Sequence, residues 1–253
     1  MPFVAMVPLP LLPNKFPKPI LCYVTDSRAL GHRGSGETVD DTANQVLDVV
    51  RECAAARVDW VQLREKHLPA RELVCLAREA SAIARAACTT MRIIINGRLD
   101  VAVAVGGDGI HLGAESLPVE SVFKWRSTAN HDAKPKSNRA GGAGAKIAPD
   151  FLIGVSCHYL DEIQQAEIAG ADYIFFGPIF PTPSKKRYGP PLGLEKLAEA
   201  CGRSHLPVLA IGGITPENAG ECLRAGASGI AAIRLFQKAR DLRGVIDHLH
   251  QLQ

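Results

Sequence analysis

The regular alternation of short apolar runs with longer helical stretches constrains the fold of this chain most strongly. Eight short runs are nearly all apolar and rich in β-branched residues, which is typical of strands buried on both faces of a parallel sheet. The predicted strands are Ile20–Thr25, Trp60–Leu63, Arg92–Asn96, Gly109–Leu112, Leu152–Ser156, Tyr173–Phe176, Val208–Ile211 and Gly229–Ile233. The helical patterns between them cover Thr42–Ala56, Ala70–Ala87, Leu160–Ala169, Leu194–Cys201, Pro216–Ala225 and Leu242–Leu252.

Eight such units predict the α/β class and a single (β/α)₈ TIM barrel. The length of 253 residues agrees, because one such barrel takes about 250 residues. The phrases AGADYI (169–174) and AGASGI (225–230) recur, and each ends a helix with glycine and opens the next strand. Strand counting alone leaves an open doubly wound sheet as the competing architecture.

Two segments fall outside the repeating pattern. Residues 1–19 carry five prolines between positions 2 and 17, so we expect an irregular N-terminal arm instead of a signal helix. Residues 126–150 are rich in Lys, Arg, Gly, Ala and Asn and offer almost nothing to bury, which predicts a disordered insertion. The barrel itself is expected to span residues 20–253.

The amino-acid composition limits the cellular location and the kinds of partner that we expect for this protein. The formal net charge of +3 is too small to indicate a nucleic-acid partner, and no apolar run is long enough to span a membrane. Seven cysteines are widely spaced and form no zinc-type pair, which favours reduced thiols in the cytoplasm. The sequence is compatible with a homo-oligomer and does not specify one.

Polar residues that directly follow the predicted strands are the candidate site residues, since in a barrel these positions converge on the active site. After the second strand, alternation places Gln62, Arg64 and Lys66 on one side. Two cations and an amide suit a phosphate or a diphosphate. Pairing of Arg64 and Lys66 with nearby acids at the rim is the alternative.

The third to fifth strands end in one or two polar residues each, and the roles of these residues are open. Asn96 could donate an amide to a ligand or form an Asn-Gly turn, and His111 is expected to be a satisfied buried group. Ser156 and His158 could face a ligand, and an imidazole can move a proton at neutral pH. His158 could equally cap the following helix or bond Asp161. Cys157 is a weaker candidate nucleophile.

The last three strands are followed by loops suited to phosphate. Thr182, Ser184 and Lys185 lie in a long loop that reads as a lid able to place a lysine over a polyanion. A solvated basic loop is the alternative. Gly212 and Gly213 follow the seventh strand and Arg234 follows the eighth, where barrels often hold phosphate with backbone N–H groups.

Six motifs occur in the order found in one known family. They are QLREK (62–66), IINGR (94–98), GDGIHLG (107–113), GVSCH (154–158), ADYIFFGPIFPTPSKK (171–186) and LAIGGITPENA (209–219). Together they resemble the thiamine phosphate synthase family over roughly residues 20 to 236. The resemblance implies a TIM-barrel transferase of thiamine biosynthesis. Such enzymes join an aminopyrimidine diphosphate to a thiazole phosphate and release pyrophosphate.

The resemblance also implies a role for each matching residue. Lys185, Ser156 and His158 are the predicted catalytic residues, and Gln62 and Ser156 are expected to meet the pyrimidine. Arg64, Lys66, Asn96 and Lys185 are expected to surround the diphosphate. The predicted thiazole phosphate site consists of Thr182, Ser184, Gly212, Gly213 and Arg234.

The metal site departs from the family pattern. The family carries acids at the positions of Gly97 and Ser116, and these acids bind Mg²⁺, a hard cation that prefers carboxylate oxygens. Glu115 is the adjacent candidate to replace them. Arg234 stands where the family has a serine, and its guanidinium could still bind phosphate.

Two alternatives follow from these departures. Asn96-Gly97-Arg98 resembles the sister family of thiazole tautomerases, which aromatise a thiazole carboxylate phosphate without a metal or other cofactor. His158 would then be the acid and base. The loss of the acidic ligands also leaves open a phosphate-binding relative without catalytic activity. Gln62, Lys66 and Lys185 favour the synthase.

Overall fold

The computed structural model describes residues 19–30, 39–87, 90–131, 148, 150–182 and 190–252. The first half contains β1 (Ile20–Val24), the 3₁₀ helix η1 (Ser27–Ala29), α1 (Val39–Ala55), β2 (Trp60–Leu63), α2 (Ala70–Ala86), β3 (Arg92–Asn96), α3 (Leu99–Val105), β4 (Gly109–Leu112) and α4 (Val119–His131). The second half contains β5 (Leu152–Cys157), α5 (Leu160–Ala169), β6 (Tyr173–Phe176), α6 (Gly193–Arg203), β7 (Val208–Ile211), α7 (Pro216–Arg224), β8 (Gly229–Ala232), α8 (Arg234–Gln237) and α9 (Leu242–His250).

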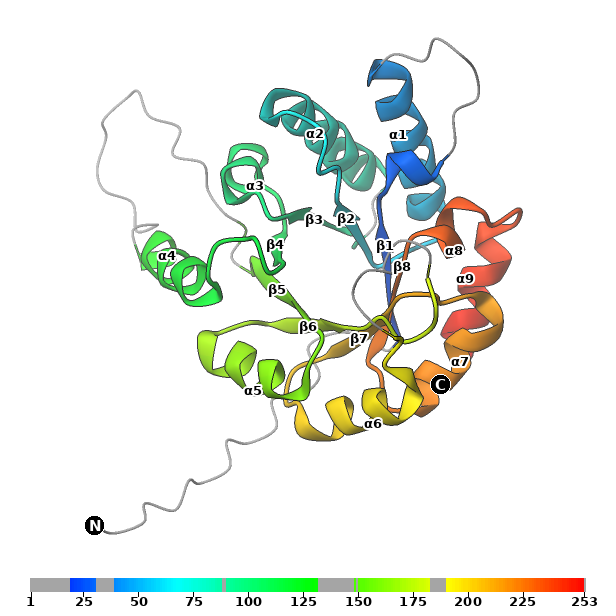
Figure 1. The fold of residues 1–253 in the computed structure, drawn as a ribbon. Coiled ribbons are helices and arrows are strands. Elements are labelled where there is room, and N and C mark those ends of the chain that lie inside the picture. Colours follow the sequence, from blue (N-terminus) through cyan, green and yellow to red (C-terminus); the bar gives the residue numbers. More distant parts are fainter. Residues whose placement is uncertain are drawn as a thin grey trace, which may run out of the picture.

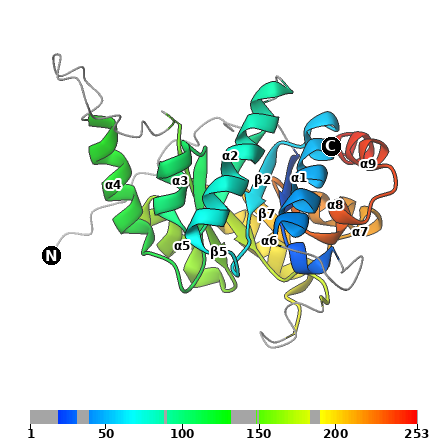
Figure 2. The same ribbon diagram turned by 90° about the horizontal axis from the view of Figure 1, so that it is seen from above.

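The strands form a closed parallel barrel in the order β1 to β8, in which β8 pairs with β1. The helices lie around the outside of the strands in both ribbon views (Figures 1 and 2). The predicted TIM barrel is confirmed, and the open sheet is excluded. All the predicted strands are present with bounds that differ by at most one residue.

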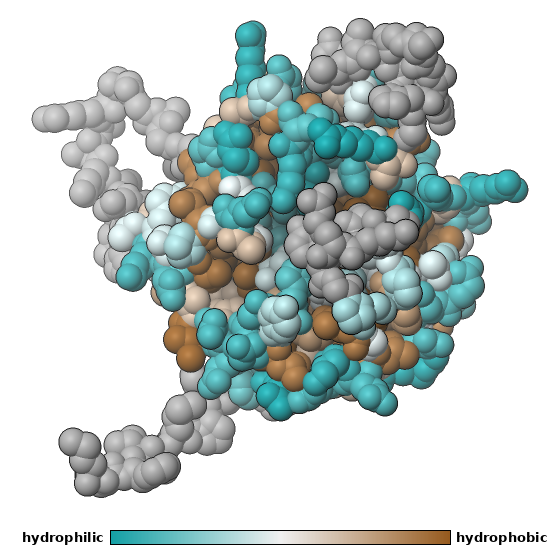
Figure 3. All heavy atoms as spheres, in the orientation of Figure 1, coloured by the Kyte–Doolittle hydropathy of each residue, from teal (hydrophilic) through white to brown (hydrophobic). Residues whose placement is uncertain are grey.

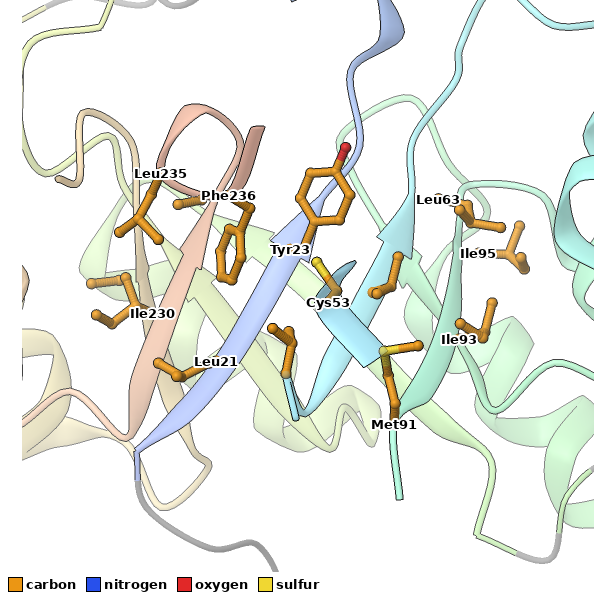
Figure 4. Close-up of a cluster of buried hydrophobic side chains, with 14 of the residues drawn as sticks. Leu21, Tyr23, Cys53, Leu63, Met91, Ile93, Ile95, Ile230, Leu235 and Phe236 are labelled. Atoms are coloured by element: carbon orange, nitrogen blue, oxygen red, sulfur yellow. The ribbon is translucent and has the colours of Figure 1, made fainter. Parts of the chain in front are cut away.

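Alternation along each strand separates two apolar clusters. Outward-facing side chains such as Leu21, Tyr23 and Ile93 lie on the outer face of the strands in the close-up (Figure 4), and they form one cluster with residues of the surrounding helices. Inward-facing side chains fill the barrel with a second cluster made of Ile20, Cys22, Val24, Trp60, Ile94, Leu152, Tyr173, Phe175, Leu209 and Ala231. The barrel interior is therefore a packed core and not a pore.

Three aspartates join neighbouring strands at the N-terminal end of the barrel. Each precedes an even-numbered strand, and its carboxylate accepts a hydrogen bond from the backbone N–H of the strand before it. The pairs are Asp59 with Leu21 at 2.8 Å, Asp108 with Ile93 at 2.7 Å and Asp172 with Ile153 at 2.7 Å. Ser228 takes the equivalent position before β8, where its carbonyl accepts from Ile20 N at 3.0 Å.

The predicted insertion at 126–150 begins too early. Helix α4 continues to His131, so residues 126–131 are helical. Arg126 explains the difference, because its guanidinium pairs with Asp172 and donates to the Phe151 carbonyl at 2.8 Å. Of the predicted insertion, residues 132–147 and 149 lie outside the described residues, as do residues 1–18 of the predicted arm.

The surface of the barrel carries few large apolar side chains. Hydrophilic residues dominate the face drawn in the space-filling view, with smaller apolar areas between them (Figure 3). Among the residues that the structure describes, the exposed large hydrophobic ones are Leu117, Phe123, Tyr159 and Ile168. Within the described ranges, no helix combines the length and the apolar character needed to cross a membrane.

Candidate functional site

Four polar side chains enter the barrel interior at the C-terminal ends of β2 to β5. Gln62 and Asn96 each lie two residues beyond a member of the interior apolar cluster, and Ser156 lies four residues beyond Leu152 of the same cluster. His111 alternates with residues of the outer cluster. Because side chains on a strand alternate between its two faces, all four project inward. The chain thus places a polar layer on top of the apolar filling of the barrel.

Gln62 is buried with 2% of its surface exposed, and its Nε2 has no hydrogen-bond partner among the described residues. Burying an amide N–H without an acceptor costs free energy, so such groups normally have partners. An acceptor on a bound ligand would satisfy this N–H. Gln62 is therefore well suited to the ligand contact that the sequence predicts for it.

His111 lies between two hydroxyl groups. Its Nε2 is 2.9 Å from Ser156 Oγ, and its Nδ1 is 3.2 Å from the hydroxyl of Tyr173. The ring also stacks against Phe175 with 4.3 Å between the ring centroids. His111 is the satisfied buried group that its sequence context predicts, whereas its partner Tyr173 is not evident from the sequence.

The end of β2 is fixed by a buried acid between the two cations. Glu65 is 4% exposed and accepts a hydrogen bond from Ser27 Oγ at 2.6 Å, while Arg64 N donates to Thr25 Oγ1 at 2.9 Å. These bonds tie the loop after β1 to the end of β2. Lys66 is exposed beside this anchored segment.

The loops after β6 and β7 lie against each other because two glycines allow it. A Cβ added at Gly213 would stand 2.7 Å from the carbonyl oxygens of Phe180 and Pro181, and Gly213 has a φ of +68°. Gly212 accepts a hydrogen bond from Phe180 N at 3.0 Å. This packing holds Thr182, two residues after Phe180, near the start of the β7 loop.

All the predicted site residues within the described ranges lie in the C-terminal part of a parallel strand or in the segment after it, so they lie at one end of the barrel. Arg234 is the first residue of α8 and is exposed there. Ser184 and Lys185 lie outside the described residues. The roles of these residues in ligand binding stay predictions.

The surrounding protein holds the His158 ring and buries the Cys157 thiol. The His158 ring hydrogen-bonds to the carbonyl of Gly177 through Nδ1, and its backbone N–H donates to Glu162. The ring therefore links the end of β5 to the loop after β6. Burial raises the pKa of the Cys157 thiol to about 12, which removes the thiolate that a nucleophile needs.

The positions of the missing acids are neighbours in space. A Cβ at Gly97 would lie 3.3 Å from Ser116 Oγ, which itself accepts from Gly113 N at 3.0 Å. The adjacent Glu115 is exposed, and its carboxylate is 3.9 Å from Lys66 Nζ. Asp100 is engaged by Arg98 at 2.6 Å.

These side chains do not fit a protein-held Mg²⁺ ion. Within the described ranges, no three His, Cys, Asp or Glu side chains are grouped so that they could hold a metal. Mg²⁺ is usually bound by one or two carboxylates together with substrate phosphates. Of the two carboxylates closest in sequence to positions 97 and 116, Asp100 pairs with Arg98 and Glu115 lies beside Lys66.

Comparisons with known proteins point to one family. A family model described as thiamine monophosphate synthase matches residues 36–129 and 136–236. The thiamine-phosphate synthase of Roseiflexus sp. (strain RS-1) is 35% identical, and the match covers 91% of this chain and 84% of that protein. The thiamine-phosphate synthase of Moorella thermoacetica is 38% identical, with 81% of this chain and 87% of that protein covered.

A solved structure supports the same assignment. The thiamine phosphate pyrophosphorylase from Pyrococcus furiosus superposes with a TM-score of 0.69 at 30% identity, over 92% of this chain and 95% of that one. The 3-hexulose-6-phosphate synthase from Salmonella typhimurium, at 13% identity and a TM-score of 0.57, shows only that the fold is shared. Because a family model and several well-covered relatives agree, this chain belongs to the thiamine monophosphate synthase family.

Proposed function

We propose that this protein is a thiamine phosphate synthase, a transferase of thiamine biosynthesis. It joins the methyl carbon of an aminopyrimidine diphosphate to the nitrogen of a thiazole phosphate and releases pyrophosphate. The observation that carries the proposal is the unsatisfied buried amide of Gln62 on β2, which is followed in the chain by the less buried Arg64 and the exposed Lys66. An unpaired buried donor on the same strand end as two cations suits a heterocycle with a diphosphate attached.

Each residue has a role in substrate binding that depends on its place in the site. Arg64, Lys66, Asn96 and Lys185 hold the diphosphate. When the diphosphate leaves, the cations Arg64, Lys66 and Lys185 neutralise the negative charge that develops on it. Gln62 and Ser156 hold the pyrimidine. Thr182, Ser184, Gly212, Gly213 and Arg234 hold the thiazole phosphate and so direct its nitrogen at the methyl carbon.

The tautomerase alternative is not favoured. It needs the His158 ring to move a proton on the substrate, and the hydrogen bond of Nδ1 to the Gly177 carbonyl orients this ring without deciding between the two activities. The relatives described above carry synthase names. A cytoplasmic location, the absence of a nucleic-acid partner and the oligomeric state stay predictions.

The decisive experiment measures pyrophosphate release by the purified full-length chain from both substrates, with and without Mg²⁺. We expect release, and we expect Lys66→Met to lower kcat/KM by about 10- to 100-fold, because a hydrogen bond to a charged group is lost. Lys196→Met is the matched control, since Lys196 is exposed on α6 and pairs with Glu199 at 3.2 Å.

Two outcomes would contradict the proposal. Absence of pyrophosphate at every Mg²⁺ concentration would exclude the synthase. Metal-free aromatisation of a thiazole carboxylate phosphate that is lost in His158→Ala would establish the tautomerase in its place.

A further inference from the structure

We infer that His111 and Tyr173 are positioning residues that fix the Ser156 hydroxyl as a hydrogen-bond donor toward the substrate. This inference rests on the proposed function for the identity of the substrate. The geometry itself comes from three neighbouring strands. His111 in β4 is in register with Gly154 in β5, and Gly154 is in register with Tyr173 in β6.

Gly154 makes the contact between His111 and Tyr173 possible. A Cβ added at Gly154 would stand 2.0 Å from Cζ of Tyr173 and 2.4 Å from its hydroxyl oxygen. Only glycine leaves room for the phenol to cross β5 and reach the histidine. The tyrosine is fully buried and the histidine is 2% exposed, so the bond between them is shielded from water.

The Tyr173 hydroxyl sets the tautomer of His111. A buried phenol needs an acceptor for its proton, and the nitrogen that it contacts is His111 Nδ1, at 3.2 Å. If Nδ1 accepts, the ring is neutral and carries its proton on Nε2. Nε2–H then donates to Ser156 Oγ across 2.9 Å.

The hydrogen bond from His111 determines the direction in which the Ser156 hydroxyl points its proton. Its oxygen accepts from His111, so its own proton is free to point at the substrate. Gln62 Nε2 is a second buried donor that projects into the same polar layer. Two donors in this layer select a ring that presents acceptors, as the ring nitrogens of an aminopyrimidine do.

The first test reads the tautomer directly and needs no substrate. ¹⁵N NMR of the full-length chain, with the His111 signals assigned by their loss in His111→Gln, is expected to show a proton on Nε2 only. Tyr173→Phe is expected to mix the two tautomers. A proton on Nδ1 in the wild-type chain, or an unchanged spectrum in Tyr173→Phe, would overturn the inference.

The second test measures the Kd of the aminopyrimidine diphosphate by calorimetry. Tyr173→Phe and Ser156→Ala are each expected to weaken binding by about 3- to 10-fold, which corresponds to one hydrogen bond. The double variant should bind no more weakly than Ser156→Ala, because the phenol acts through the serine. Additive losses, or an equal loss in the Kd of the thiazole phosphate, would overturn the inference.

Matched variants separate positioning from folding. Tyr23→Phe removes a hydroxyl that is equally buried and accepts from Gln237 at 3.0 Å on the outer face of β1, and it should leave the Kd unchanged. His111→Gln keeps one donor and one acceptor and should retain more affinity than His111→Leu. If the wild-type chain does not bind the aminopyrimidine diphosphate, the proposed function fails, whereas the NMR result still decides the tautomer.

Discussion

Lys66 Nζ lies 3.9 Å from Glu115 Oε2, and this contact brings the loop after β2 to the loop after β4. The two side chains are 60% and 94% exposed, so the pair adds little to stability. Glu115→Gln should therefore leave the free energy of unfolding within about 0.5 kcal/mol of the wild-type value. Removing the carboxylate also frees Lys66 for a polyanion.

We expect pyrophosphate to bind Glu115→Gln about two- to three-fold more tightly at low salt, with a smaller gain at high salt, because screening weakens exposed charges. Calorimetry at two ionic strengths measures both values. Weaker binding that added Mg²⁺ restores would instead identify Glu115 as a metal ligand.

Installing carboxylates at positions 97 and 116 should create the missing metal site. Gly97 has a φ of +69°, which aspartate tolerates better than most residues, and position 116 is its direct neighbour. We expect G97D/S116D to lower the Mg²⁺ concentration that gives half-maximal pyrophosphate release by about ten-fold or more, since Mg²⁺ prefers carboxylate oxygens.

Mg²⁺ binding measured by calorimetry in the presence of pyrophosphate gives a second readout for the same variant. G106D is the control, because Gly106 has a similar φ of +63° with no atom near its Cβ and follows α3 at the other end of that helix. An equal effect in G106D would show that added charge, not a metal site, causes the change.

Gly213→Ala should separate the loops after β6 and β7. The added methyl meets two carbonyl oxygens at 2.7 Å, and the positive φ adds a cost of about 1 kcal/mol. We expect a total loss of more than about 2 kcal/mol in urea unfolding, together with weaker binding of the thiazole phosphate. Gly106→Ala carries the φ cost without the clash, so a similar loss in both variants would contradict the packing argument.

Asp59, which precedes β2, makes stability depend on pH. Burial raises the pKa of Asp59 above its usual range. The folded protein therefore holds this proton more tightly than the unfolded chain, and the associated stability is lost as pH rises through the folded-state pKa. Relative to the wild type, Asp59→Asn should gain free energy of unfolding as pH rises above about 4, the unfolded-state pKa.

Asp100 provides the control of opposite sign. Its hydrogen bonds from Arg98 lower the pKa of the carboxyl, so the stability that it contributes is present above the unfolded-state pKa and is lost as pH falls. Asp100→Asn should therefore lose stability relative to the wild type as pH rises through about 4. Urea unfolding across this range tests both slopes, and equal slopes would contradict the assignment.

The sequence predicts the strands well because most are almost wholly apolar, and it predicts the helices only where their apolar spacing is regular. Helices α3 and α8 were missed because Leu99–Val105 and Arg234–Gln237 are short and apolar enough to resemble strand ends. Helix α4 was missed because its polar second half merges with the segment that follows. The partner that anchors Arg126 is Asp172, which lies 46 residues further along the chain.

The sequence predicts only those residues of the candidate site that lie at or just after the end of a strand. Alternation places Gln62, Asn96 and Ser156 inward with no further information. The link from Ser156 through His111 to Tyr173 depends on two registers and on a glycine in the middle strand. The sequence shows these residues one by one and does not show that they touch.

The three aspartates before β2, β4 and β6 also bear on how this barrel can be altered. They connect the strands in pairs at the end of the molecule that takes no part in the proposed chemistry. The ligand-facing loops can therefore be exchanged or lengthened while these connections persist. Redesign for a different phosphorylated substrate can start from the loops and retain the closure of the barrel.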